Sequence, residues 1–500
     1  MERVLFTCWI YLTVLKLNSS TSNGVLHLNV LNLSNALFTL FFYFLISRFT
    51  PPEVLNAVSI FFVSYSIYSV VSAFSLNMST LAKISQSYDS GEKQRITYVR
   101  SAVNITTFSS LLPAIFIFLV GFLLYPNLSY TLPIVLGILS GGVSNYSRIF
   151  LVNKYSIFNK ISTILAFFFV FSFPRILSLL LYFWLKIHYG IEIGFLLGYI
   201  ISVVVLFPRG LLNGNKENLK EPFSRSLPLY ILSLIGLGQE WLGTISIIFL
   251  TSGGYLIGRY YILNALNIFL VSICTQVFLA IYPVLAKKGI LNHDRDTVAI
   301  SRMINRIVIT ILISLVIYIS VESGNISEIL FGSSTFFLQM SLVFLSISTL
   351  LATFGGLYVN SYGLFTYFLI SGQKFRVIYL AGGASLVTFV ISMFVLTMTF
   401  GIIGIPLAFL MMNLVSFLIV KKGLGVQSQG NNLITYRLLM YSILLFLFLF
   451  FSSFETSTLG VYLSILISSS AFIIAGLTLL LIVKPVTLSE LKIILRTIGS

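Results

Sequence analysis

The sequence has very few charged residues for its length. Only 9% of its 500 residues are charged, whereas 57% are hydrophobic and the mean hydropathy is +1.01. In typical soluble domains about a quarter of the residues are charged, because a water-facing surface must be largely polar. The composition therefore excludes a soluble globule and predicts a polytopic membrane protein.

Residues and motifs typical of catalysis are also scarce. The two cysteines, Cys8 and Cys274, lie in apolar surroundings without a CxxC or Cys/His pattern, and the three histidines are scattered. The chain has no GxxxxGK phosphate-binding loop and no GxSxG nucleophile motif. The sequence thus indicates no disulfide, no metal site and no cofactor, and it offers no motif for ATP-driven or hydrolytic chemistry.

Long apolar runs dominate the chain instead. About 20 helical residues cross a hydrocarbon layer of about 30 Å, so runs of this length predict membrane-spanning helices. The runs lie at 26–47, 55–79, 102–125, 131–152, 161–185, 191–207, 227–250, 256–285, 303–321, 335–369, 377–400, 402–420, 436–453 and 459–483. They predict an all-α fold of about fourteen transmembrane helices, preceded by an interfacial lead-in at 1–25. The tenth run contains Gly355-Gly356, where glycine favours a break.

The basic residues predict the topology. If the N-terminus is cytoplasmic, 26 of the 30 Lys and Arg residues fall on inner segments. Only Arg48, Lys186 and Arg259 fall on outer segments, and Arg175 lies within a span. This asymmetry follows the positive-inside rule and predicts that both termini are cytoplasmic. Topology therefore accounts for the net charge of +16, and no nucleic-acid partner is expected.

Two hairpins of the chain resemble each other. Thr50 follows the first run and Thr251 the seventh, and Leu81-Ala82-Lys83 ends the second run as Leu285-Ala286-Lys287 ends the eighth. The offsets are all about 201 to 205 residues. A constant offset predicts two homologous six-helix bundles of the same orientation, related by a pseudo-twofold axis along the membrane normal. The alternative is that membrane hairpins in general look alike.

The repeat predicts a division of the chain into domains. These are a lead-in at 1–25, an N-terminal six-helix lobe at 26–208, a basic cytoplasmic linker at 209–225, a C-terminal six-helix lobe at 226–420, and two additional helices with a cytoplasmic tail at 421–500.

Short motifs spread over residues 26–420 resemble those of one transporter superfamily. They are Leu45–Glu53 after the first run, Gly258–Tyr261 and Tyr282–Ala286 at the two ends of the eighth, Leu330–Gly332 and Leu369–Lys374 around the tenth, and Gly401–Ala408 opening the twelfth. In this order they resemble the polysaccharide and O-antigen flippases of the multidrug/oligosaccharidyl-lipid/polysaccharide exporter superfamily. Two positions depart from that pattern. A glycine is replaced around Asn56, and Glu240 lies about one turn before the acidic position of that family.

The resemblance implies a structure and a function. It implies two pseudo-symmetric bundles that form a V around a cavity and alternate between inward-open and outward-open states. The implied activity moves a lipid-linked oligosaccharide, on a polyprenyl or dolichyl phosphate or pyrophosphate carrier, to the outer leaflet of the plasma membrane. Such transport serves cell-surface glycan or glycoprotein assembly. Membrane lipids are the other expected partners, coupling to H⁺ or Na⁺ is compatible with this reading, and we expect a monomer.

Three other functions remain open at this stage. A cation-coupled small-molecule antiporter of the same superfamily would favour a more acidic cavity, whereas acids are few here. A membrane glycosyltransferase or polysaccharide polymerase would need a large outer loop with catalytic acids, but the outer connections are short. Their acids are Glu53, Glu192, Glu322, Glu328 and Glu455. A purely structural membrane protein is the remaining alternative.

Two charged residues fall inside predicted spans at similar depths. Arg175 and Glu240 each lie about fourteen residues into an apolar run. A charge at mid-bilayer costs about 2.5–3.5 kcal/mol on insertion scales, so each needs a partner or a wet cavity. Arg175 is a candidate for contact with the carrier phosphates, and Glu240 for H⁺ or Na⁺ coupling. The alternatives are a salt bridge between the two, or an Arg175 side chain that snorkels to an interface beside the kink at Pro174.

Further polar residues are weaker candidates for substrate binding. Arg48 and Arg259 lie at predicted outer helix ends, where they attract a pyrophosphate or simply anchor the helices. Asn29, Asn32 and Asn35 recur every third residue and form a stripe that lines a cavity or pairs with neighbouring helices.

Two glycosylation sequons fall in predicted outer loops. They begin at Asn127 and Asn325, and the sequence leaves open whether either is modified.

Overall fold

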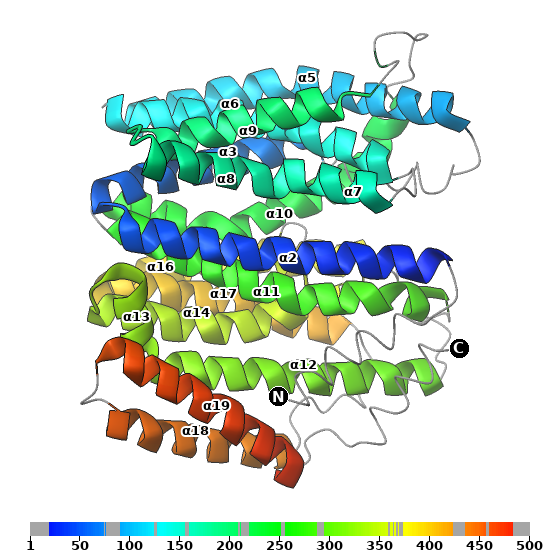
Figure 1. Cartoon of the computed structure of the whole chain (residues 1–500). Helices are drawn as coiled ribbons and strands as arrows, with labels where there is room; N and C mark the ends of the chain where they lie inside the picture. The colour runs from blue at the N-terminus through cyan, green and yellow to red at the C-terminus, as the bar shows by residue number, and fades with distance from the viewer. Residues whose placement is uncertain are drawn as a thin grey trace. The chain divides into compact units, whose positions relative to one another are not determined.

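The computed structural model consists almost entirely of helices (Figure 1). It describes residues 20–74, 76, 91–124, 128–155, 160–208, 211, 220–251, 256–287, 295–358, 361–363, 365–366, 369, 374–423, 436–456 and 460–483. Within these ranges, nine helices are long and apolar enough to cross a membrane, or ten if one bent pair is a single span. The predicted all-α, polytopic membrane fold is confirmed.

In the described residues the helices follow one another along the chain, together with one two-stranded sheet. They are α2 (Ser20–Phe49), α3 (Pro52–Ala73), α5 (Gly91–Leu124), α6 (Leu128–Tyr155), α7 (Lys160–Phe167), η2 (Phe168–Ser172), α8 (Phe173–Leu179), η3 (Leu180–Trp184), α9 (Gly190–Leu206), α10 (Lys220–Thr251), α11 (Leu256–Lys287), α12 (Arg295–Val321), α13 (Ser323–Phe331), α14 (Phe336–Gly355), α16 (Phe375–Phe400), η5 (Gly401–Ile403), α17 (Gly404–Gly423), α18 (Tyr436–Thr456) and α19 (Val461–Val483). Strand β1 (Leu357–Tyr358) pairs antiparallel with β2 (Ser361–Tyr362).

Every predicted apolar run overlaps one or more described helices, but the boundaries differ. The first helix begins at Ser20 and not near residue 26. The expected break in the tenth run is confirmed, because α14 ends at Gly355 and the β1–β2 pair follows. The connection expected after residue 321 contains a further helix, α13, which is bent by 74° from α12 at Glu322.

Residue contacts divide the chain into two compact units. The first unit is Ser34–Ile262, and the second is Leu263–Ser500 together with Met1–Leu33. In the first unit α3 packs on α6, α6 on α9, and α8 on α9, while α10 contacts α3 and α5. In the second unit α17 packs on α14 and α16, and α12 contacts α14 and α18. The predicted repeat of two six-helix lobes stays a prediction.

Helices α8 and α9 approach each other through glycines. Gly190, Gly194 and Gly198 recur every fourth residue and share one face of α9. A Cβ atom added at Gly190 would lie 2.7 Å from the Leu181 backbone, and one at Gly198 would lie 2.5 Å from Pro174 Cα. Small residues of this spacing let membrane helices pack backbone to backbone. The pairs show that α8 and α9 run antiparallel, so α9 fixes the position of the helix that carries Arg175.

The second unit contains an interaction that bears on one sequon. The Asn325 side chain donates hydrogen bonds to Glu322 Oε2 at 2.7 Å and to Ser464 Oγ of α19 at 3.3 Å. The hydroxyl of Ser327 is buried and donates to the Ser323 carbonyl. In this conformation the sequon is helical and partly buried, and its asparagine joins α13 to α19. Asn127 lies outside the described residues.

The glycine face of α9 predicts the effect of one substitution on stability. Gly194→Ala adds a Cβ that meets the Ser178 backbone more closely than at the neighbouring glycines, so we expect destabilisation by about 1–3 kcal/mol. Gly383→Ala in α16 is the matched control, because a Cβ there meets nothing within 4 Å and alanine is the better helix former. Thermal unfolding in detergent measures both. Equal unfolding midpoints for the two variants would contradict the close packing of α8 and α9.

Candidate functional site

The helix that carries Arg175 is irregular on both sides. The π-helical turns η2 and η3 flank α8, and Pro174 lies in the first turn of α8. The Phe173 N–H donates to the Phe168 carbonyl, one residue further back than in an α-helix. Pro174 has no N–H to donate. The Phe169 carbonyl would accept from the Phe173 N–H in an α-helix and from residue 174 in a π-helix. Because the Phe173 N–H is directed to Phe168 and Pro174 has no N–H, the Phe169 carbonyl lacks a backbone donor in its own helix.

A side chain from α9 supplies the missing donor. The Ser202 hydroxyl donates a short hydrogen bond to the Phe169 carbonyl and also contacts the Gly198 carbonyl at 2.7 Å. An unsatisfied carbonyl in an apolar environment is costly, so this contact stabilises the π-helical turn. The irregular turn and its neighbour α9 together set the orientation of the residues that follow Pro174.

Arg175 donates hydrogen bonds to uncharged acceptors within the first unit. Its guanidinium donates a hydrogen bond to Asn35 Oδ1 of α2 at 3.0 Å and another to the carbonyl of Phe171. Its side chain is half-buried. Both of these acceptors are uncharged, so they orient the guanidinium without neutralising it. The asparagine stripe predicted from sequence thus contributes Asn35 to the setting of Arg175, whereas the side chains of Asn29 and Asn32 lie outside the described ones.

Two hydrogen-bonded pairs of tyrosine hydroxyls lie in the same unit as Arg175. Tyr43 and Tyr261 share a hydrogen bond of 2.9 Å, and Tyr65 and Tyr199 share one of 2.8 Å. Hydroxyls both donate and accept hydrogen bonds, which suits them to contact phosphate oxygens or sugar hydroxyls.

Aromatic stacking holds these tyrosines in place. The Tyr261 ring stacks on Phe62 of α3 and on Trp241 of α10, with ring centroids 5.8 and 5.4 Å apart. The Tyr65 and Tyr199 rings stack on each other at 5.8 Å. Stacked rings keep their hydroxyls in fixed positions at low entropic cost. The cluster therefore joins α2, α3, α9, α10 and the start of α11.

A second guanidinium, which belongs to one of the 26 basic residues assigned to inner segments, lies in this cluster. Arg148 of α6 donates a hydrogen bond from Nη2 to the Tyr65 hydroxyl at 2.9 Å. It was assigned to an inner segment, but its side chain is half-buried inside the first unit. The signal that could have identified Arg148 as a candidate site residue is its position within the apolar candidate span Ser129–Leu151.

Among the described acids of the first unit, two are buried. Glu240 of α10 was predicted to lie inside a span, and its side chain is only 7% exposed. Glu192, counted from sequence among the outer connections, is 1% exposed in the first turn of α9, and its Oε2 has no hydrogen-bond partner. Intramembrane acids often mark ion or proton pathways, so Glu192 joins Glu240 as a candidate coupling residue.

The predicted outer arginines lie at helix ends of the first unit. Arg48 is in the last turn of α2, and Arg259 is in the first turn of α11; both are half-buried. Beside Arg259, the Gly258 N–H donates to Asn56 Oδ1 at 2.9 Å. Asn56, which stands near the position of a glycine in the flippase family that the sequence resembles, therefore supplies a hydrogen-bond acceptor for the first turn of α11. Asn56 and Gly258 are 202 residues apart in the sequence, which lies within the offset of the predicted repeat.

Among the residues that the structure describes, no group of three or more His, Cys, Asp or Glu side chains is placed to hold a metal ion. The chemistry of the cluster is thus that of two guanidiniums, tyrosine hydroxyls and amides. Such groups bind oxyanions and polyhydroxylated ligands through hydrogen bonds.

The contact between Ser202 and the π-helical turn predicts a stability difference. Ser202→Ala removes the donor to Phe169, and we expect a loss of about 1–3 kcal/mol for the unsatisfied buried carbonyl. Ser59→Ala is the matched control, because that buried hydroxyl donates only to the Leu55 carbonyl of its own helix. Unfolding midpoints in detergent compare the two. If Ser59→Ala costs as much as Ser202→Ala, the cross-helix contact does not stabilise the turn.

No protein-family model matches the sequence, and no curated protein matches it either. Solved structures of transporters, however, share its fold. The lipid II flippase MurJ in an inward closed conformation has a TM-score of 0.56 at 14% identity, over 89% of this chain and 97% of MurJ.

Two MATE transporters superpose almost as well. VcmN of Vibrio cholerae in its bent form has a TM-score of 0.53 at 13% identity, over 82% of this chain and 99% of VcmN. The eukaryotic MATE transporter AtDTX14 has a TM-score of 0.53 at 13% identity, over 84% and 99% of the two chains. The chain therefore has the all-helical fold that the flippase MurJ shares with MATE transporters.

Proposed function

We propose that this protein translocates a lipid-linked oligosaccharide from the cytoplasmic to the outer leaflet of its membrane by alternating access. The observation that carries the proposal is Arg175, a guanidinium within an apolar span that is oriented by two uncharged acceptors. A charge in this setting costs free energy unless a ligand or water compensates it. A phosphate of the lipid carrier offers that compensation through charge-assisted hydrogen bonds.

The surroundings of Arg175 suit the rest of such a substrate. The glycan requires hydrogen-bonding walls at membrane depth, and the paired hydroxyls of Tyr43 with Tyr261 and of Tyr65 with Tyr199 are candidates to line them. Helices satisfy their own backbone groups, so polar side chains can face a wet pathway inside a helical membrane protein. The lipid chain would stay in the bilayer while the head group crosses.

The fold supports transport, and the named MurJ structure supports a lipid-linked substrate. MurJ is described as a lipid II flippase, and its chain is covered almost completely. The carrier here would be a polyprenyl or dolichyl phosphate or pyrophosphate. We propose the plasma membrane, cytoplasmic termini and a monomeric state as the setting for this activity.

A cation-coupled small-molecule antiporter is the second candidate. It is favoured by the similarity to MATE transporters and by the burial of Glu192 and Glu240 in the first unit. In that case the arginines would be structural, and a phosphate-bearing lipid would not be required. Gene deletion with a leaflet-resolved assay of lipid-linked glycans separates the two functions, because only loss of a flippase retains these glycans on the cytoplasmic leaflet.

The proposed role of Arg175 is tested by complementing that deletion with variants of the protein. Arg175→Ala should reduce the appearance of lipid-linked glycans on the outer leaflet by at least about tenfold, since it removes the phosphate contact. The amount of inserted protein should be unchanged. Arg376→Gln, which removes an exposed positive charge at the start of α16, is the matched control and should complement fully. Full complementation by Arg175→Ala would leave only a structural role for this residue.

The proposed coupling role of Glu240 is tested with a carboxamide. Glu240→Gln keeps the size and hydrogen-bonding capacity but cannot ionise, so transport should fall and lose its dependence on an imposed H⁺ or Na⁺ gradient. Glu53→Gln, at an exposed carboxylate in the first turn of α3, is the control. Leaflet-resolved transport in energised and uncoupled vesicles measures both. A Glu240→Gln variant that still responds to the gradient would remove Glu240 from the coupling mechanism.

A further inference from the structure

We propose that Tyr230 is a latch that holds the first part of α10 against the end of α3, and that this latch opens whenever that end of the protein opens. The inference rests on the alternating access of the proposed function, but on no property of the substrate. In the predicted division of the chain, α3 belongs to the N-terminal lobe and α10 opens the C-terminal lobe. A contact between these two helices is therefore one that a movement of the lobes would break.

Helix α3 ends at a residue with an unusual backbone conformation. Phe74, its C-cap, has φ 50° and ψ 27°, which is the left-handed conformation that glycine adopts at many helix ends. A bulky side chain is rarely found there, because its Cβ approaches the following carbonyl oxygen. Such a conformation persists only where neighbouring groups hold it, and it is typical of segments that switch. The end of α3 therefore requires contacts from other elements.

The Tyr230 side chain of α10 supplies two of these contacts. Its ring stacks on the Phe74 ring, with centroids 4.0 Å apart and an interplanar angle of 14°. Its hydroxyl donates a hydrogen bond to the Val71 carbonyl at 3.2 Å. The last four carbonyls of an α-helix have no partner within the helix, and α3 ends at Ala73. Tyr230 thus holds the cap residue in place and satisfies one of the terminal carbonyls.

Other hydrogen bonds at this end of α3 come from α5 and α6. The Ser109 hydroxyl of α5 donates to the Ser72 carbonyl at 2.7 Å. Asn145 Nδ2 of α6 donates to the Ser69 carbonyl at 3.0 Å and to the Ser72 hydroxyl at 2.9 Å. Ser69, Ser72 and Asn145 are buried, whereas Tyr230 is only half-buried. The attachment of α10 is therefore more accessible to water than the contacts that join α3 to α6.

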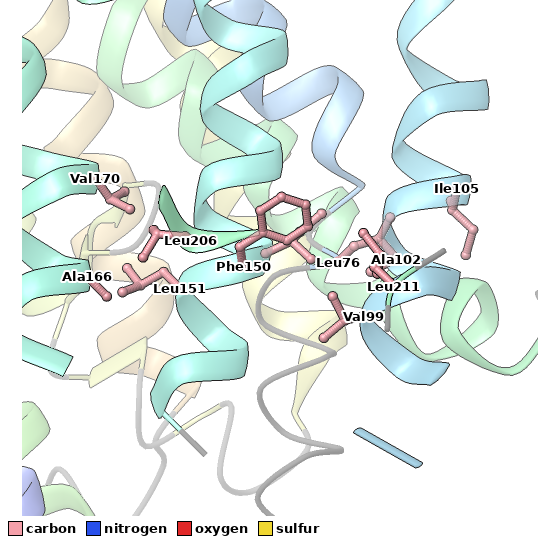
Figure 2. Close-up of a cluster of buried hydrophobic side chains, with 11 residues drawn as sticks. Leu76, Val99, Ala102, Ile105, Phe150, Leu151, Ala166, Val170, Leu206 and Leu211 are labelled. Atoms are coloured by element: carbon pink, nitrogen blue, oxygen red, sulfur yellow. The ribbon is translucent and has the colours of Figure 1, made fainter. Parts of the chain in front are cut away.

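Phe74 also packs against a cluster of buried apolar side chains. Figure 2 shows this cluster, to which α5, α6, α7, η2 and α9 contribute. Leu211, in the chain that leads from α9 to α10, is a member, and its carbonyl accepts from Arg100 Nε at 2.6 Å. The cluster and this anchor do not include α10. Release of Tyr230 would therefore leave the cluster intact and free only the first part of α10.

A separate contact attaches the same hairpin at the opposite end of α3. There the Gly258 N–H at the start of α11 donates to Asn56 Oδ1. Helix α10 lies between Tyr230 and Gly258 along the chain, so the hairpin is attached to α3 at both ends. In alternating access one end opens while the other stays closed. Release of Tyr230 with the Asn56 contact kept is the change that would open the end at which α3 stops.

The test measures how fast buried reporter cysteines react with a water-soluble maleimide in the purified full-length protein. The Ser226→Cys reporter lies one turn before Tyr230 on α10, at a side chain that is fully buried. The Ser59→Cys reporter is fully buried in the opposite half of α3. Both are made in a protein that carries Cys8→Ala and Cys274→Ala, so only the reporter reacts.

Tyr230→Leu removes the aromatic ring and the hydroxyl of the latch. It should raise the labelling rate of Ser226→Cys at least about fivefold, because local opening exposes that face of α10, and leave Ser59→Cys unchanged. Tyr318→Leu is the matched control, since this tyrosine of the second unit bonds to the Ser469 hydroxyl, and it should change neither rate. Unchanged labelling of Ser226→Cys would overturn the latch. An equal increase at both reporters would also overturn it, because Tyr230 would then stabilise the whole unit.

A reversible cross-link keeps the test independent of the stability of Tyr230→Leu. The Phe74→Cys, Tyr230→Cys double variant is joined by a short bis-methanethiosulfonate reagent, and leaflet-resolved transport is measured before cross-linking, after it and after reduction. Cross-linking should lower transport at least about tenfold, and reduction should restore it, because a closed latch blocks the conformational cycle. Full transport by the cross-linked protein would overturn the proposal. If even the wild type moves no lipid-linked glycan, the proposed substrate fails, and the labelling of Ser226→Cys still decides the latch.

Discussion

The central constraint on this protein is that polar groups inside an apolar environment must find partners from other helices. At the π-helical turn before Pro174, a carbonyl of one helix accepts from the Ser202 hydroxyl of its neighbour. That contact is possible only because Gly194 and Gly198 let α9 approach the backbone of α8. The position of Arg175 therefore depends on glycines that never touch it.

The same constraint explains why the tyrosines are clustered. Hydroxyls inside a helical bundle satisfy one another, as Tyr43 does with Tyr261 and Tyr65 with Tyr199. The guanidinium of Arg148 donates a hydrogen bond to one of these hydroxyls, that of Tyr65, without losing its charge. The proposed transport function uses this charge. A phosphate binds more strongly to a guanidinium with neutral acceptors than to one that is already paired with a carboxylate.

Several features of the site were accessible from sequence because they are local. Arg175 and Glu240 stand out as ionisable residues within apolar runs, and the break at Gly355-Gly356 follows from the weak helix propensity of glycine. Arg148 was missed because the positive-inside rule counts charges near helix ends and does not say where a side chain leads. Glu192 was assigned to a connection because it stands only one residue inside its run, but α9 begins at Gly190 and buries it.

By itself the sequence determined the helical class, the membrane setting and the approximate ends of the spans, since these depend on the hydrophobicity and length of contiguous segments. Only the tertiary structure decided that Arg148, Arg175 and Asn35 share one region with four tyrosines. These residues lie on different helices, and their proximity depends on helix register and on backbone contact at glycines. Neither property can be read from the periodicity of a span that is apolar on every side.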